Sequence, residues 1–176
     1  KISVPVSLTY PKSIAIIGPI NFPLMAAIQR TLILLKPDAL QRDLVGEIIH
    51  RFELKGLKLI GMKMIRLEDA ILDEHYAHHK DKHFFPGLKK MMMSSPVVAL
   101  ILEGAEAVNG VRLIVGPTAG HEADAGSIRG DLSNIKAGNL VHASDSAENA
   151  EAEIKRFFTP NEIFEYAKVT DQFFYE

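Results

Sequence analysis

The chain has 176 residues, of which 47% are apolar, and its formal net charge is −2. This length predicts one domain with its own core, and the near-neutral charge argues against the basic face that specific or non-specific nucleic-acid binding requires. The sequence contains no cysteine, which excludes disulfides and thiolate zinc sites. No apolar run approaches the roughly 20 residues of a membrane-spanning helix, so we expect a protein that does not enter a membrane.

Residues 1–24 differ from the rest of the chain in composition. They contain four prolines, no acidic residue and no helical periodicity. We interpret them as an N-terminal extension of vector or upstream origin, with Met25 as the native start and residues 25–176 as the functional domain. We therefore expect the protein to be cytoplasmic. The alternative is that residues 1–24 are a processed leader that targets the protein to an organelle.

From residue 31 onward, strand and helix patterns alternate. Apolar runs predict strands at 31–35, 57–66 and 96–102, the last one central because it is continuously apolar. Helical spacing predicts helices at 44–52, 68–79, 86–92 and 106–114, before a long irregular loop at 116–137. This order fits an α+β fold, a ferredoxin-like two-layer sandwich with a four-stranded antiparallel sheet and surrounding helices. A parallel doubly wound sheet would also fit the order, but no Gly-rich turn follows the first strand.

A final short strand leads into a histidine. Leu140 and Val141 precede His142, and this pattern predicts an imidazole at the end of a strand. Asp145 or Ser146 then caps a helix that runs from about residue 147 to 158.

That last helix places a carboxylate near its buried side. Glu153 lies at the edge of an apolar stripe that includes Ala150 and Phe157. A carboxylate there needs a partner, because burying it alone is costly. Binding one ring nitrogen of His142 would satisfy Glu153 and leave the other ring nitrogen free to attack. On spacing alone, a core histidine and a surface glutamate that never meet is the competing interpretation.

The motif Asn-x-x-His-Ala-Ser-Asp at residues 139–145 resembles the active-site signature of the nucleoside diphosphate kinases. The resemblance extends from about residue 29 to residue 176 without an obvious insertion or deletion. Its further motifs, in order, are Lys36-Pro37-Asp38, His75-Tyr76, Phe84-Phe85-Pro86-Gly87-Leu88, Ser95-Pro96-Val97-Val98, Ile128-Arg129-Gly130-Asp131 and Tyr175-Glu176. The resemblance implies an antiparallel sheet and a kinase that transfers the γ-phosphate of a nucleoside triphosphate to a nucleoside diphosphate. It also implies a ping-pong mechanism through a phosphohistidine on His142.

The resemblance implies roles for further residues at the phosphate end of a site. Lys36, Arg112 and Arg129 match the phosphate-binding cations, and Thr118 and Tyr76 match residues that reach the phosphates. Mg²⁺ would arrive with the nucleotide and needs no protein ligands.

At the other end, Phe84 matches the aromatic residue that stacks on the base, with Leu88 beside it. Asn139 matches the residue that contacts the ribose hydroxyls, and Ser144 matches a serine near the His142–Glu153 pair. The resemblance also implies a homo-oligomer, with a hexamer favoured over a tetramer.

Two positions depart from the family pattern. The family commonly has a proline two residues after the threonine, where this chain has Gly120, so we expect a looser loop and weaker subunit association. Lys136 stands where the family often has a valine against the base, although its methylene stem could still cover the base. Base preference is therefore not fixed by the sequence.

Two other functions compete with the kinase. A metal-binding module is suggested by His75, His78, His79 and His83, which fall close together on a predicted helix and just after it. No H-E-x-x-H motif completes that set. A non-catalytic interaction protein on the same fold would be favoured if His142, Lys36 or Arg129 had been replaced, and all three are present.

Overall fold

The computed structural model describes residues 27–170, so the predictions for residues 1–24, for Met25 and for Tyr175-Glu176 lie outside the described residues. Its strands are β1 (Ile28–Leu35), β2 (Lys58–Ile65), β3 (Val97–Ala105) and β4 (Val141–Ala143). Its α-helices are α1 (Pro37–Gln41), α2 (Val45–Leu54), α3 (Asp69–His75), α4 (Phe85–Met92), α5 (Ala107–Val115), α6 (Ile128–Leu132) and α7 (Ala147–Phe157). None of the helices within residues 27–170 is long and apolar enough to cross a membrane.

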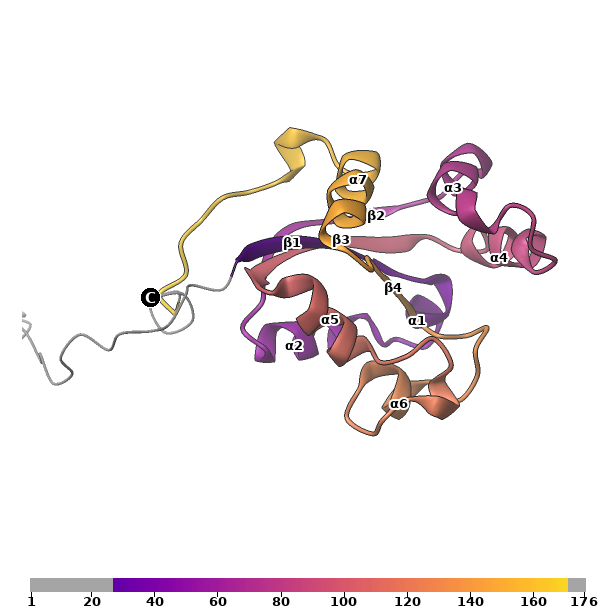
Figure 1. Cartoon of the computed structure of the whole chain (residues 1–176), viewed down its shortest axis with the longest axis horizontal. Helices are drawn as coiled ribbons and strands as arrows, with labels where there is room; N and C mark the ends of the chain where they lie inside the picture. The colour runs from indigo at the N-terminus through magenta and orange to yellow at the C-terminus, as the bar shows by residue number, and fades with distance from the viewer. Residues whose placement is uncertain (1–26, 171–176) are drawn as a thin grey trace, which may run out of the picture.

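The four strands form one sheet in the order β2-β3-β1-β4, and every neighbouring pair is antiparallel. This confirms the predicted ferredoxin-like α+β sheet and excludes the parallel alternative. Helices α2 and α5 lie on one face, whereas α7 lies on the other, with α3 and α4 at one end of the sheet (Figure 1).

Both faces of β1 are buried, which explains the continuous apolar sequence of its second half. Ile33 and Leu35 pack in the core under α2 and α5, while Leu32 and Leu34 pack in the core under α7. All four side chains are completely buried. Fully burying one such side chain contributes about 1.5–3 kcal/mol, so the two cores together make the sheet a rigid platform.

The alternation of side chains along β4 decides where the histidine points. Val141 pairs with Leu35, and His142 pairs with Leu34. Because opposed residues in an antiparallel pair share a face, His142 lies on the face of the sheet that α7 covers. The sheet register therefore brings the imidazole to the helix that carries Glu153.

Several predicted elements differ in extent from the observed ones. β1 begins at Ile28 rather than residue 31, and the helix predicted at 68–79 is divided into α3 and a 3-10 turn at Ala77–His79. Helix α1 was not predicted, and α6 lies within the region predicted as an irregular loop. Both missed helices have five residues, too few for a helical period to appear in the sequence.

Gly120 lies against a neighbouring segment of the chain, and the looser loop expected from the sequence stays a prediction. Gly120 is buried, and a Cβ atom on it would overlap the carbonyl oxygen of Ser133. The Ser133 hydroxyl in turn donates to the carbonyl oxygen of Gly138 at 2.6 Å and lies 3.0 Å from that of Ile135. Glycine is therefore required at 120 for a close approach to the segment that leads to Asn139.

Candidate active site

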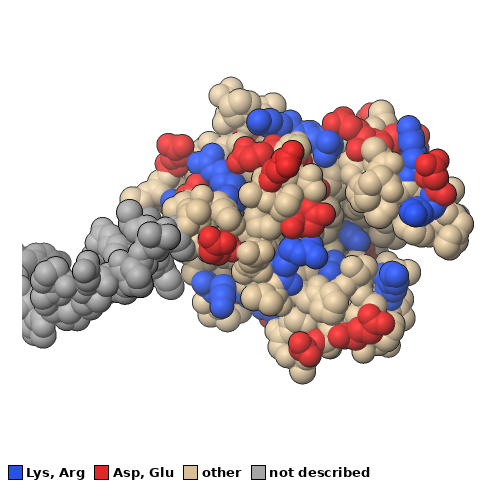
Figure 2. Space-filling view, in the orientation of Figure 1, with Lys and Arg blue, Asp and Glu red and all other residues tan. Residues whose placement is uncertain are grey.

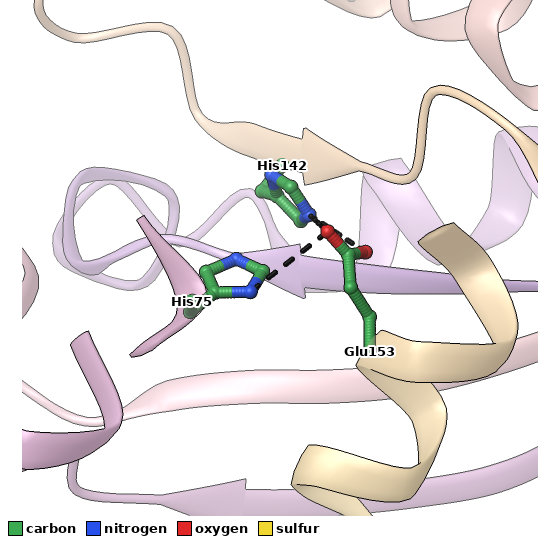
Figure 3. Close-up of side chains that lie close together, drawn as sticks. All are labelled: His75, His142 and Glu153. Carbon is green, nitrogen blue, oxygen red and sulfur yellow. Dashed lines mark hydrogen bonds and ion pairs between the residues drawn. The ribbon is translucent and has the colours of Figure 1, made fainter. Parts of the chain in front are cut away.

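The His142–Glu153 pair predicted from spacing forms in the structure. The Nε2 atom of His142 lies 3.1 Å and 3.0 Å from the two carboxylate oxygens of Glu153 (Figure 3). Both side chains are mostly buried, with 19% and 12% of their surfaces exposed. A carboxylate at Nε2 fixes the proton on that atom, so the Nδ1 atom carries the free lone pair.

Ser144 completes the environment of the carboxylate. Its hydroxyl donates a hydrogen bond of 2.6 Å to Glu153 Oε2 and accepts one of 3.2 Å from the backbone N–H of Leu32. Burial acts to raise the pKa of Glu153, but the hydrogen bonds from His142 and Ser144 outweigh it and lower the pKa below its ordinary value. Glu153 is therefore ionised at neutral pH. The helix cap itself is Ser146, which accepts from the Asn149 N–H.

His75 lies directly behind this pair and was not predicted to do so. Its ring is 4.5 Å from the His142 ring, edge to face, and its Nδ1 atom is 3.8 Å from Glu153 (Figure 3). Burial, reinforced by the charge on His142, lowers the pKa of His75 to about 3. A neutral imidazole therefore fills the space behind His142 without competing as a cation for Glu153.

His142 and Glu153 line a pocket with a volume of about 1280 Å³. Every residue predicted for the site except Ser144 lines it: Lys36, Tyr76, Phe84, Leu88, Arg112, Thr118, Arg129, Lys136, Asn139, His142 and Glu153. Figure 2 shows a hollow between the lobe of α3 and α4 and the lobe of α6, with basic side chains within it. The structure thus gathers residues separated by up to 117 positions into one cavity.

Lys36 and Arg129 are buried cations at the inner wall of the pocket. Lys36 Nζ donates a 2.6 Å hydrogen bond to Asn139 Oδ1, and burial, with Arg129 nearby, lowers the pKa of Lys36 to about 8. Arg129 donates to the carbonyl oxygens of Asn139, Gly116 and Val141, and burial lowers its pKa to about 10. A guanidinium has five N–H groups, so two remain for an anion in the pocket.

The outer part of the pocket is open to solvent. Arg112, Thr118 and Lys136 are exposed residues of its lining. Phe84 is 44% exposed, whereas Phe85 next to it is 6% exposed and belongs to the core. Phe85 is thus the core residue of this pair, and Phe84 is left free to meet a planar ligand.

Tyr76 contributes a polar atom to the buried wall. Its side chain is 5% exposed, and among the described residues its hydroxyl has no hydrogen-bond partner. Burial, with the charge on Glu153, raises the pKa of this hydroxyl, which therefore stays protonated. An orphan donor that lines a cavity is suited to an oxygen-rich ligand.

The histidines considered as a metal module do not act together. His78 and His79 lie on the 3-10 turn with ring centroids 3.9 Å apart, while His75 faces His142. Within residues 27–170, the one group of metal-ligating atoms is His75, His142 and Glu153. Its carboxylate already accepts hydrogen bonds from His142 and Ser144. The structure therefore does not support the proposed set of His75, His78, His79 and His83.

Comparison with known proteins supports one interpretation of this cavity. The family model described as nucleoside diphosphate kinase matches residues 29–163. A nucleoside diphosphate kinase of Parabacteroides distasonis is 53% identical over 138 residues, which cover 78% of this chain and 90% of that protein. One from Thermococcus kodakarensis is 48% identical over 152 residues, covering 84% of this chain and 87% of that protein.

Solved structures agree in fold as well as in sequence. A halophilic nucleoside diphosphate kinase from Halobacterium salinarum in complex with CDP superposes with a TM-score of 0.82 at 41% identity, covering 85% of this chain and all of that chain. A nucleoside-diphosphate kinase from Borrelia burgdorferi, a transition state mimic with bound vanadate and ADP, gives a TM-score of 0.78 at 31% identity. It covers 84% of this chain and 96% of that chain.

Proposed function

We propose, because the chain belongs to the nucleoside diphosphate kinase family, that the cavity described above carries out the family reaction with His142 as the nucleophile. The enzyme is a phosphotransferase that moves the γ-phosphate of a nucleoside triphosphate to a nucleoside diphosphate by a ping-pong mechanism through a phosphohistidine. The assignment of individual residues to its steps is our proposal.

The observation that carries the proposal is that one ring nitrogen of His142 is hydrogen-bonded to Glu153 while the other is free. Nε2 of His142 is held by Glu153, and the second ring nitrogen points away from that carboxylate (Figure 3). In the first half-reaction, a bond forms between Nδ1 and the γ-phosphorus while the bond to the bridging oxygen breaks, and the diphosphate leaves. In the second, the terminal phosphate oxygen of another diphosphate attacks the same phosphorus and regenerates the free imidazole. Glu153 stabilises the positive charge that the ring carries in between.

We assign phosphate binding to the cations of the cavity. Lys36, Arg112 and Arg129 would surround the transferring group, with Tyr76 and Thr118 donating from either side. Arg112 is the most available of the three, because it is exposed and has no hydrogen bond or ion pair with another side chain in the described part of the chain. Phosphoryl transfer depends mainly on such positioned charge.

Nucleoside recognition is assigned to the outer part of the cavity. Phe84 offers an exposed ring face for stacking, which tolerates any base, and Leu88 packs beside it. Lys136 would cover the base from the opposite wall with its methylene stem. The side-chain amide of Asn139 accepts one hydrogen bond from Lys36 and donates one to the Thr118 carbonyl. One lone pair and one N–H therefore remain for the ribose hydroxyls.

Mg²⁺ fits this site as part of the nucleotide complex. The Glu153 carboxylate in the pocket is already hydrogen-bonded to His142 and Ser144, so the metal would keep phosphate oxygens and water as ligands, and we assign it no protein ligand. When bound, it neutralises part of the phosphate charge.

Incubation with γ-labelled ATP tests the nucleophile. We expect a labelled protein whose label is lost in acid and retained in base, as for phosphohistidine, and we expect His142→Ala to lose both the label and the transfer activity. His50→Ala is a matched control, because His50 is an exposed histidine on α2. Steady-state transfer by pure His142→Ala protein would remove His142 from this role.

We further propose that the enzyme acts in the cytoplasm as a homo-oligomer, most simply a hexamer. β2 is an edge strand of the sheet, and its Met62 and Met64 side chains are 57% and 64% exposed, which suits pairing of two edge strands into a dimer. We expect dimers to persist when hexamers dissociate on dilution. Light scattering over a concentration series tests this, and a monomer at micromolar concentration would contradict it. Fractionation of cells tests the location.

A further inference from the structure

The backbone immediately before the strand of His142 is strained. Leu140 has a φ of 66°, in the left-handed region that aliphatic side chains rarely adopt. The N–H of Val141 donates to the carbonyl of Asn139 at 2.7 Å, so Leu140 is the central residue of a γ-turn. Strained conformations persist only where surrounding groups hold them, and they gather at functional sites.

The segment Lys36–Asp38 holds this turn from both sides. The backbone N–H of Lys36 donates to the Leu140 carbonyl at 2.8 Å, and the Leu140 N–H donates to Asp38 Oδ2 at 3.0 Å. Both backbone polar groups of Leu140 are thus paired with one short segment that is about 100 residues away in sequence. His142 follows two residues later, so these contacts fix the position of the backbone from which the imidazole extends into the cavity.

The charge of the Asp38 carboxylate also acts on two cations of the phosphate end. Its charge raises the pKa of both Lys36 and Arg129, against the effect of burial on each. Its second oxygen, Oδ1, is buried without a hydrogen-bond partner in the described part of the chain. The groups that face the Lys36 ammonium are thus Asp38 from α1, Arg129 from α6 and the amide of Asn139.

We propose that Asp38 is a positioning residue for the transfer reaction, whose carboxylate holds the turn at Leu140 and thereby places His142. Its negative charge also favours the cationic form of Lys36. This rests on the proposed function of His142. Asp38 touches neither nucleotide nor phosphate in this scheme. It acts through the two groups that do.

Two substitutions separate the two roles. In Asp38→Asn, the amide oxygen still accepts from the Leu140 N–H, whereas the charge is gone. We expect its rate of phosphoenzyme formation at pH 7 to stay within about threefold of wild type, with the alkaline limb of its pH profile moved to lower pH. In Asp38→Ala, the N–H loses its acceptor, and we expect phosphoenzyme formation to slow about 10- to 100-fold.

Quench-flow measurement with γ-labelled ATP gives these rates, and ¹⁵N NMR of the histidine rings reports the environment of His142. The His142 signals should be unchanged in Asp38→Asn and shifted in Asp38→Ala. Asp43→Asn is the matched control, because it makes the same chemical change at an exposed position between α1 and α2.

Each outcome decides one part of the proposal. A wild-type rate and wild-type ring signals in Asp38→Ala would overturn the role in placing His142. An unmoved alkaline limb in Asp38→Asn would overturn the electrostatic role. If Asp38→Ala does not fold, Asp38→Asn carries the test, since a 10-fold or larger loss at pH 7 would show that the amide cannot replace the carboxylate and would refute the division of roles. Absence of phosphohistidine in the wild-type enzyme would instead refute the proposed function.

Discussion

Replacing Glu153 by glutamine tests the pair at the centre of the site. The amide is nearly the same size as the carboxylate, so it can still accept from the Ser144 hydroxyl, which lies 2.6 Å from Glu153 Oε2. It cannot supply a negative charge to the imidazole of His142. The substitution therefore removes charge from the 3.0 Å contact and leaves most of the packing of α7 in place.

The size of the effect follows from the nature of this contact. A hydrogen bond to a charged group contributes about 1.5–3 kcal/mol, and the ring is more positive in the transition state than in the free enzyme. If that contribution is lost from the transition state, phosphoenzyme formation slows roughly 10- to 150-fold. Because the contact is formed with the ring rather than with the nucleotide, KM should change much less than kcat.

Single-turnover quench-flow with γ-labelled ATP measures this step directly. Glu151→Gln is the matched control, because Glu151 is an exposed residue on the same helix. The low pKa of Glu153 in the folded state also means that its contribution to stability is present above the unfolded pKa of about 4.3 and is lost as the pH falls through the folded value. A single-turnover rate equal to wild type would show that Glu153 has only a structural role.

Three further predictions concern other parts of the cavity. Because the pKa of Lys36 is about 8, kcat/KM should fall as the pH rises above that value, and Lys36→Arg, where active, should extend the plateau to higher pH in a pH-rate profile. Phe84→Ala should raise the KM for all nucleotides by roughly 5- to 150-fold through lost stacking, with little change in thermal stability, whereas Phe164→Ala, at a more exposed but remote position, should not. Equal KM values for the two variants would contradict the stacking role. Because His75 is neutral in the fold with a pKa of about 3, while the unfolded value is near 6.5, unfolding free energy should decrease as the pH falls from 6.5 toward 3; urea titrations should show a smaller decrease in His75→Gln.

Much of the fold could be predicted from local patterns. The continuous apolar runs of the two central strands follow from burial on both faces, and the amphipathic helices show their stripe in the sequence. The ends of the strands were less predictable. The first residues of β1 include Arg30, whose partner is Glu103 across the strand pair at 2.9 Å, and such a polar pair gives no apolar signal.

The candidate site could be predicted in part, because its central pair is local. His142 and Glu153 are 11 residues apart, so a strand end followed by a helix brings them together. His75 and Asp38 gave no such signal, since their contacts span 67 and about 100 residues. Spacing grouped His75 with its neighbouring histidines, whereas the packing of α3 against α7 turns it toward His142. Asp38 belongs to a motif that the sequence displays, but its role depends on a turn that only the structure reveals.

The contacts that hold the inner wall of the cavity together also hold its cations in place. Arg129 donates to the carbonyl groups on either side of Leu140, and Lys36 holds the Asn139 side chain, so both cations also brace the segment before His142. Burial makes their charge costly, as their lowered pKa values show. A dianionic phosphate in the cavity would offset this desolvation, because its negative charge stabilises the cationic forms of both side chains. The strand that carries the nucleophile and the cations that we assign to the transferring phosphate are therefore fixed by one set of contacts, so that, on this assignment, little reorganisation is needed at the moment of transfer.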